Sequence, residues 1–130
     1  MIGLDTSFVL DLLEGKTDAV LLADRLKDES FAVSPITVFE VLVGIYSSKF
    51  PQATEENQAL KFFDHVETIP FVFFPAQESA KLSGALARSG KPLQATDAMI
   101  AGGLQFHGCT SIITRDSDFK NIPGLDVINY

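Results

Sequence analysis

The hydrophobic positions of this chain fall into two alternating patterns. Short, largely apolar runs predict buried β-strands at residues 2–4, 31–33, 70–74, 111–114 and 127–128. Between them, apolar positions recur every three or four residues opposite polar ones, which predicts amphipathic helices. The first helix is expected to be capped by Thr6 or Ser7 and closed by Gly15, and the others to lie near residues 20–28, 37–46, 54–66, 77–87 and 96–107.

Strands that alternate with helices indicate a parallel sheet, because each return to the same end of the sheet needs a long crossover connection. We therefore expect an α/β fold, a three-layer sandwich in which a mostly parallel central sheet is flanked by helices. The chain has 130 residues and contains no repeat, low-complexity tract or linker. Residues 1–130 are accordingly expected to form a single domain.

The composition limits the kinds of site and the cellular compartment that we expect for this protein. Apolar residues make up 46% of the chain and include 11 Phe, enough for a large core with some apolar surface left for a partner. The single cysteine, Cys109, excludes an internal disulfide framework and a thiolate metal cage. No apolar run approaches the roughly 18 residues of a membrane span, and the first residues lack the basic region of a secretory signal. A cytoplasmic protein without a membrane partner is the expectation.

Four acidic residues stand where packing alone gives no reason for a carboxylate: Asp5, Glu40, Asp97 and Asp116. Asp5 ends the first predicted strand and Asp116 closely follows the strand at 111–114, so both should lie at the carboxyl edge of the sheet, where ligands bind in such folds. Asp97 stands in the first turn of its helix, where the helix dipole tolerates an anion. A converging set of carboxylates repels itself unless a divalent cation neutralises it, which points to a metal site.

Each acid also has a simpler interpretation when it is taken alone. Asp5 is a possible helix cap, Asp97 a dipole-complementing residue and Asp116 a turn former. Glu40 is harder to explain in this way because it lies inside a helix between apolar neighbours, where a charge needs a cation or a hydrogen-bonded partner. We favour less the interpretation that all four acids have only these local roles and yet converge on one edge of the sheet.

The net charge of −7 argues at first against a nucleic-acid substrate, because phosphate binding requires Lys and Arg. Bound divalent ions would offset much of the acidic cluster, so any surface that faces nucleic acid must be local. Six basic residues lie near the predicted edge or the helix ends around it, with scattered surface charge as the alternative: Lys16, Lys49, Arg88, Lys91, Arg115 and Lys120.

The sequence segments around the four acids resemble the motifs of PIN-domain nucleases, especially the VapC-like toxins of prokaryotic toxin–antitoxin pairs. Residues 2–10 (IGLDTSFVL) resemble the family's opening motif, and residues 34–44 (SPITVFEVLVG) its second acidic motif. Residues 90–101 (GKPLQATDAMIA) resemble the third, and residues 114–119 (TRDSDF), followed by IPGL, the fourth. The four motifs occur in the family's order and span nearly the whole chain.

The resemblance implies a Mg²⁺- or Mn²⁺-dependent endoribonuclease with a PIN-like sandwich, which forms a homodimer and is silenced by a cognate antitoxin protein. It implies that Asp5, Asp97 and Asp116 bind the metal and that Glu40 is a ligand or holds a water. In the last motif Asp118 stands beside Asp116 as an accessory ligand or a supporting residue. Thr6 and Thr114 are expected to orient the carboxylates.

Alternatives from other classes remain open. The same motifs would suit a housekeeping PIN-domain nuclease that processes RNA, or a catalytically silent PIN-like scaffold that binds RNA or protein. A phosphoacceptor receiver domain needs a pair of acids after the first strand, and Asp5 has no acidic neighbour. A haloacid-type phosphatase needs an Asp-x-Asp-x-Thr motif, which Asp5-Thr6-Ser7 does not supply.

Overall fold

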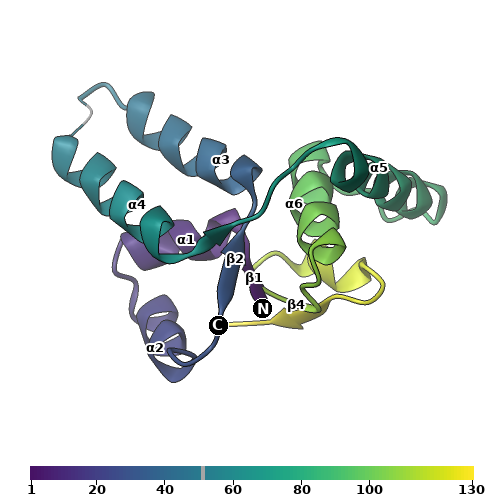
Figure 1. The fold of residues 1–130 in the computed structure, drawn as a ribbon, viewed down its shortest axis with the longest axis horizontal. Helices are drawn as coiled ribbons and strands as arrows, with labels where there is room; N and C mark the ends of the chain where they lie inside the picture. Colours follow the sequence, from purple (N-terminus) through teal and green to yellow (C-terminus); the bar gives the residue numbers. More distant parts are fainter. Residues whose placement is uncertain (51) are drawn as a thin grey trace.

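The structure is a computed structural model that describes residues 1–50 and 52–130, and it places five parallel strands between two groups of helices (Figure 1). The elements are β1 (Ile2–Leu4), α1 (Thr6–Leu13), α2 (Thr17–Arg25), β2 (Phe31–Val33), α3 (Pro35–Tyr46), α4 (Ala53–His65), β3 (Glu67–Thr68), α5 (Phe73–Arg88), α6 (Ala95–Phe106), β4 (Ser111–Ile113), the 3₁₀ helix η1 (Ser117–Asn121) and β5 (Asp126–Ile128).

The strands are ordered β3-β2-β1-β4-β5, with β1 in the centre. Every pairing among the described strands is parallel, so all their carboxyl ends lie at the same edge. The predicted α/β fold with a parallel sheet is therefore confirmed. The sheet order also places the strand that ends before Asp5 directly beside the strand that leads to Asp116.

Two apolar cores, one on each face of the sheet, make the sandwich three-layered. Successive residues of a strand point to opposite faces, and Ala32 and Val33 of β2 accordingly belong to different cores, as do Ile112 and Ile113 of β4. Helices α1 to α4 cover one face, while α5 and α6 cover the other (Figure 1). Cys109 is a buried free thiol in the second of these cores.

Helix α6 lies very close to the central strand because β1 carries a glycine where they meet. A Cβ atom on Gly3 would come within 2.7 Å of Leu104 Cδ1, and Leu104 is completely buried. This contact seats α6 against the middle of the sheet. It thereby sets the position of Asp97 in the first turn of the same helix, close to the carboxyl edge.

A second glycine, Gly102 of α6, sets how closely α5 and α6 pack. A Cβ atom on Gly102 would lie 2.6 Å from the backbone Cα of Ser79, which has no room to move aside. Gly102→Ala should therefore lower the free energy of unfolding by about 1–3 kcal/mol, the usual cost of overpacking. The matched control is Gly44→Ala in the middle of α3, where nothing lies within 4 Å and removal of a flexible glycine should add about 0.5–1 kcal/mol.

Thermal and urea melts of the two alanine variants measure this difference directly. Both variants add one methyl group to a helical glycine, so helix propensity favours both alike. Equal stability changes in the two variants would contradict the close packing of α5 on α6.

The strand predicted at residues 70–74 is wrong. The observed strand β3 lies upstream at Glu67–Thr68, and Phe73 begins helix α5. Strand β2 explains the difference, because it ends at Val33 and the chain turns into α3 at Pro35, so a longer β3 would have no partner. The β-branched and aromatic residues of this segment favour a strand only where a neighbouring strand can pair with them.

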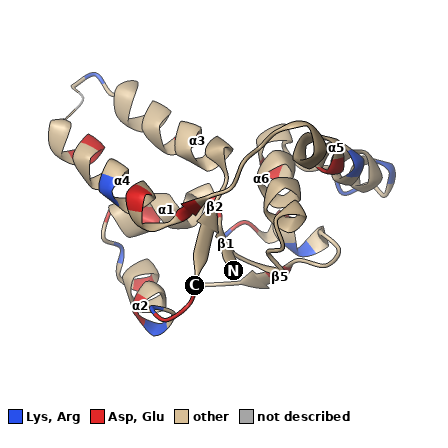
Figure 2. Ribbon diagram, in the orientation of Figure 1, with Lys and Arg blue, Asp and Glu red and all other residues tan. Residues whose placement is uncertain are grey.

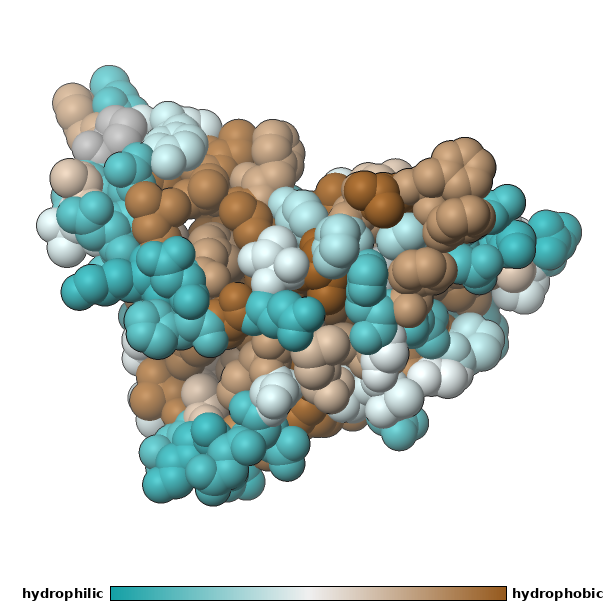
Figure 3. All heavy atoms as spheres, in the orientation of Figure 1, coloured by the Kyte–Doolittle hydropathy of each residue, from teal (hydrophilic) through white to brown (hydrophobic). Residues whose placement is uncertain are grey.

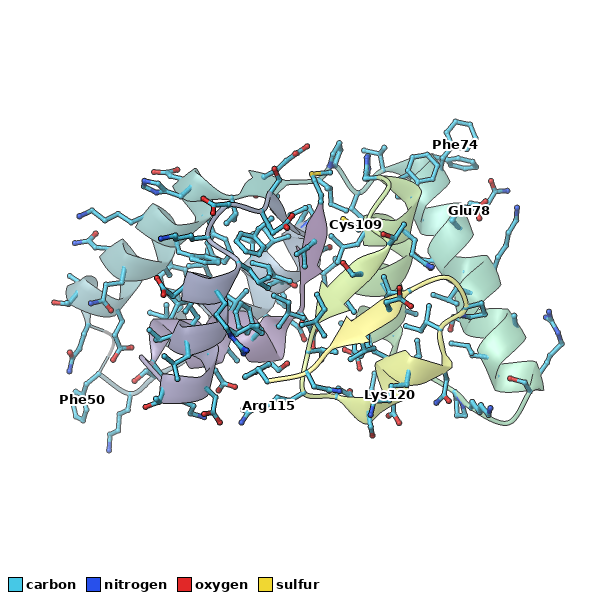
Figure 4. The ribbon with its side chains drawn as sticks, turned by 90° about the horizontal axis from the view of Figure 1, so that it is seen from below. Phe50, Phe74, Glu78, Cys109, Arg115 and Lys120 are labelled. Carbon is cyan, nitrogen blue, oxygen red and sulfur yellow. The ribbon has the colours of Figure 1, made fainter. Side chains whose placement is uncertain are left out.

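Several large apolar side chains remain on the surface. Five aromatic residues are each more than half exposed: Phe39, Tyr46, Phe50, Phe73 and Phe74. Phe73 and Phe74 were expected to lie in a core strand and instead project from the start of α5, where Figure 4 shows Phe74 at the periphery. None of the helices in the described residues is both long and apolar enough to cross a bilayer.

Candidate active site

Asp5 and Asp116 come from the carboxyl ends of two adjacent strands. Strands β1 and β4 pair with Leu4 opposite Ile113, and the Asp5 amide donates a hydrogen bond to the Ile113 carbonyl at 3.1 Å. Asp116 follows shortly after β4 and stands at the start of η1. The structure thus brings these two acids to the same edge of the sheet, where the sequence predicted them.

Asp5 is buried and held by two hydroxyl groups. Thr114 Oγ1 donates to Asp5 Oδ2 at 2.6 Å, and Ser7 Oγ donates to the same oxygen at 3.0 Å. Burial raises the pKa of Asp5 above its ordinary value and the charge of Asp116 adds to this, while the hydrogen bonds oppose the shift without cancelling it. Asp5 also occupies the N-cap position predicted for Thr6 or Ser7, although its side chain makes no capping bond.

Asp116 is fixed by the backbone of its own turn. Its amide donates to Thr114 Oγ1 at 3.0 Å, and its Oδ1 accepts from the Asp118 amide at 2.9 Å as the cap of η1. Thr114 therefore contacts both Asp5 and Asp116, which couples the two strand ends through one buried hydroxyl. The side chain of Asp118 is exposed, and its backbone supports Asp116.

Glu40 reaches the site from the second turn of α3. Thr6 Oγ1, at the start of α1, donates to Glu40 Oε1 at 2.7 Å and lies 3.1 Å from Thr37 Oγ1. The partner that a half-buried glutamate requires is thus a threonine hydroxyl from the neighbouring helix. Thr6 and Thr114 each hold a carboxylate, as predicted, whereas the contributions of Ser7 and Thr37 were not foreseen.

Asp97 is the acid on which the electrostatics of the site converge. Partial burial raises its pKa to about 6, together with the negative charges of Asp5, Asp116, Glu40 and Asp118. The charges of these four acids thus all disfavour ionisation of Asp97. The structure therefore brings the predicted carboxylates into one electrostatic cluster at the N-terminus of α6.

The cluster is not closed into a chelating set in this conformation. Within residues 1–50 and 52–130, no three carboxylate, imidazole or thiol groups are drawn together tightly enough to hold a metal ion. The donor chemistry nevertheless fits a hard divalent cation, because such ions take oxygen ligands and every acid of the cluster supplies carboxylate oxygens.

A buried acid beside this cluster, Asp11 of α1, was missed by the sequence interpretation. Lys16 Nζ lies 2.9 Å from Asp11 Oδ1, and Arg115 Nη2 and the Tyr130 hydroxyl each lie 2.6 Å from Oδ2. Burial alone would raise the pKa of Asp11, but Tyr130, Lys16 and Arg115 together lower it. The signal was available, because Asp11 is flanked by Leu10 and Leu12 within a helix in the same way that Glu40 is flanked by apolar residues.

This cluster also changes the interpretation of the basic residues. Two of the six candidates for contact with nucleic acid, Lys16 and Arg115, are paired with Asp11. Lys49 Nζ lies 5.8 Å from the ring centroid of Phe50, beyond the end of α3. Figure 2 shows Lys and Arg distributed over several elements, and Figure 4 places Arg115 and Lys120 on the same side of the molecule.

Comparison with known proteins decides the family. The model of the PIN domain matches residues 2–125, nearly the whole chain. The chain belongs to the PIN domain family. Among curated PIN-domain relatives, the tRNA(fMet)-specific endonuclease VapC of Salmonella typhimurium is 26% identical over 129 residues, covering 98% of this chain and 96% of that protein. The protein of the same name from Shigella flexneri is 25% identical, covering 94% and 92%.

Solved structures give the same fold. The VapBC2 structure from Rickettsia felis, bound to a DNA fragment from its promoter, aligns with a TM-score of 0.87 at 22% identity, covering all of this chain and 99% of that one. A toxin–antitoxin complex from Klebsiella pneumoniae aligns with a TM-score of 0.70 at 29% identity, covering 96% and 95%. The PIN-like three-layer architecture is therefore confirmed.

Proposed function

We propose that this PIN-domain protein is a divalent-metal-dependent endoribonuclease that hydrolyses RNA phosphodiester bonds and acts as the toxin of a toxin–antitoxin pair. The proposal is supported first by the placement of Asp5 and Asp116 at adjacent strand ends, joined through the Thr114 hydroxyl. Burial and the charges of four other carboxylates also raise the pKa of Asp97. Placing like charges at short range costs stability unless a cation binds among them. A protein that keeps such a cluster at a ligand-binding edge has a use for the cation.

Mg²⁺ or Mn²⁺ is the proposed ion, with Asp5, Asp97 and Asp116 as its carboxylate ligands. When bound, the ion activates a water molecule and stabilises negative charge on the phosphoryl oxygens. Glu40 is proposed as a further ligand or as the holder of a water, and Asp118 as an accessory residue on the exposed side. No protein nucleophile is needed in this scheme.

The hydroxyl groups of the site serve to orient these carboxylates. Thr114 and Ser7 both donate to Asp5 Oδ2, so neither hydroxyl occupies Oδ1. Thr6 donates to Glu40 Oε1 in the same way. Partners of this kind fix the direction of a ligand, and their loss typically weakens metal binding by about 10- to 100-fold.

RNA is proposed as the substrate because the curated relatives are named as ribonucleases. Those from Salmonella and Shigella are tRNA(fMet)-specific endonucleases, and that from Rickettsia felis is ribonuclease VapC1. At 25–26% identity we extend the reaction class to this chain and leave its target RNA open.

The antitoxin is proposed to bind an apolar groove between α1, α3 and α4. The groove has a volume of about 490 Å³ and is lined by Leu10, Leu13, Glu14, Val41, Gly44, Ile45, Glu55 and Gln58. Figure 3 shows apolar surface over the region of α3 and α4. Three aromatic residues of α1 and α3 do not line this groove: Phe8 is buried in the core, and Phe39 and Tyr46 are exposed beside it on the helix.

An apolar groove with glutamates at its rim suits an amphipathic segment that carries basic residues. A homodimer, the other assembly implied by the family, would have to cover exposed aromatic residues elsewhere. Phe73 and Phe74 at the start of α5 are the strongest candidates, because each is more than half exposed and their rings pair edge to face at 5.3 Å.

Expression in cells tests the toxin proposal and the groove together. Induction of the chain should stop growth and leave cleaved RNA, and co-expression of an adjacent antitoxin gene should restore growth. Gly44→Arg should escape this rescue by filling the groove, since a Cβ atom at Gly44 meets nothing within 4 Å. Ala87→Arg, on an exposed position of α5, adds the same charge away from the groove and should remain rescued.

Two results would count against the proposal. Growth arrest with intact RNA would remove the ribonuclease activity. Cleavage of RNA without growth arrest, from a gene with no antitoxin partner beside it, would favour a housekeeping role in RNA processing.

A further inference from the structure

Asp11 and the three side chains that contact it, Lys16, Arg115 and Tyr130, form a cluster beside the proposed metal ligands. We refer to these four residues as the Asp11 cluster. Asp11 lies in the last turns of α1, with its side chain only 3% exposed. A carboxylate buried to this degree needs donors for both oxygens, because loss of water around the charge costs several kcal/mol. It has three: Lys16 on Oδ1, and Arg115 and Tyr130 on Oδ2.

Two of these donors belong to segments far from α1 in the sequence. Arg115 stands between Thr114 and Asp116, in the turn that follows β4. Tyr130 follows β5, the edge strand beside β4. The Asp11 carboxylate therefore joins helix α1 to the site turn and to the chain beyond β5, and Figure 4 shows Arg115 beside that last segment.

Aromatic contacts hold this junction in place. The guanidinium of Arg115 lies over the ring of Tyr130, 5.6 Å from its centroid. The same ring meets Phe8 edge to face at 5.1 Å, and Phe8 is buried in the core one turn before Asp11. Arg115 is thus fixed by its charge to Asp11 and by its planar face to Tyr130.

Arg115 fixes the backbone of the turn that carries Thr114 and Asp116. Its neighbour Thr114 donates to Asp5, and its other neighbour Asp116 is a proposed ligand whose amide bonds Thr114. The Arg115 amide itself faces Ser7 Oγ at 3.4 Å, and Ser7 also donates to Asp5. A shift of Arg115 would move both hydroxyls that orient Asp5, together with Asp116.

We propose that Asp11 is a positioning residue that, through Arg115 and Tyr130, holds the 114–116 turn in the arrangement that binds the divalent cation. The proposal rests on the proposed function, because it assumes that Asp5 and Asp116 hold an ion. It also assigns Arg115 a different role from contact with RNA, since the guanidinium is already paired with a buried carboxylate.

The test measures Mn²⁺ binding to the whole chain, by calorimetry or by loss of the free-ion electron paramagnetic resonance signal, without RNA. Asp11→Asn should raise the Mn²⁺ dissociation constant by about tenfold, as expected for a residue that supports metal ligands. Tyr130→Phe keeps the ring against Phe8 and Arg115 and removes only the hydroxyl, so it should raise the constant by roughly threefold. Because both changes act through Asp11, the double variant should bind much as Asp11→Asn does.

Lys16→Ala is the matched control. It removes an ion pair with the same buried carboxylate, yet the ion pairs of Lys16 are with Asp11 and Glu14 and not with the 114–116 turn. Its Mn²⁺ dissociation constant should stay within twofold of the parent, even if its melting temperature in chelator falls. Equal losses of affinity in Lys16→Ala and Asp11→Asn would mean that Asp11 acts on general stability alone, which overturns the proposal.

Other outcomes distinguish failure of the positioning role of Asp11 from failure of the proposed function. If the parent chain binds Mn²⁺ and both Asp11→Asn and Tyr130→Phe bind it equally well, the positioning role is wrong while the proposed function stands. If Arg115→Ala keeps the Mn²⁺ affinity but raises the KM for RNA, Arg115 contacts phosphate and the positioning role is again wrong. A folded parent chain that binds no Mn²⁺ overturns both. Should Asp11→Asn fail to fold, Tyr130→Phe and Lys16→Ala still decide the question.

Discussion

Asp97→Asn should abolish RNA cleavage and leave the protein folded and, without metal, more stable. Asp97 is a proposed ligand, and loss of metal-assisted stabilisation worth several kcal/mol corresponds to a fall of about 1,000-fold or more in kcat/KM. Its carboxylate is also the one that four other acids repel, so deletion of its charge relieves the cluster. Activity and stability should therefore change in opposite directions.

Melting curves in chelator measure the second half of this expectation. After solvent screening at a half-buried carboxyl is allowed for, the gain above pH 7 should be on the order of 1 kcal/mol, or a few degrees in Tm. Asp126→Asn is the control, because that acid lies on edge strand β5, is exposed and is not among the charges acting on Asp97. A melting temperature several degrees below the parent for Asp97→Asn would contradict the model of a repelling cluster.

Metal ions should stabilise the protein more at pH 8 than at pH 5. The folded pKa of Asp97 is about 6, above its ordinary value of 3.8, so the native state binds more protons than the unfolded chain between these values. Asp97 therefore contributes stability at low pH that is lost as the pH rises through 6. Mg²⁺ or Mn²⁺ binds only the native, ionised cluster, so it reverses this loss at pH 8 and competes with a proton at pH 5.

Melts at the two pH values with each ion provide the measurement. Ca²⁺ should also raise the melting temperature, but it should support cleavage poorly because its looser coordination positions water and phosphate less strictly. Equal shifts with Mn²⁺ at pH 5 and pH 8 would rule out Asp97 as an ionised ligand. In Asp97→Asn the difference between the two pH values should shrink.

The parts of the site that the sequence predicted are those that follow from strand direction. Asp5 and Asp116 stand after apolar runs, and parallel strands bring their carboxyl ends to one edge whatever the details of packing. Asp97 was placed near this edge from its position in the first turn of a helix, where the helix dipole tolerates an anion. Glu40 was found because a charge between apolar neighbours needs an explanation, and the structure supplies the Thr6 hydroxyl.

The parts that were missed depend on contacts between distant segments. Asp11 looks like Glu40 in the sequence, but its importance appears only when Arg115 and Tyr130 reach it from beyond β4 and β5. The strand predicted at 70–74 failed for a related reason. Local preference for β structure was strong there, but the length of β2 decides how far β3 can pair, and that limit lies almost 40 residues upstream.

Chelation and re-addition of the metal ion show whether RNA cleavage depends on a divalent cation. Cleavage of a labelled RNA by the parent chain is followed in Mn²⁺, then after excess EDTA, then after Mn²⁺ is restored above the chelator. We expect cleavage to stop on chelation and to return on re-addition, with Asp97→Asn inactive at every stage. Cleavage that continues undiminished in excess EDTA would contradict the carboxylate–metal mechanism.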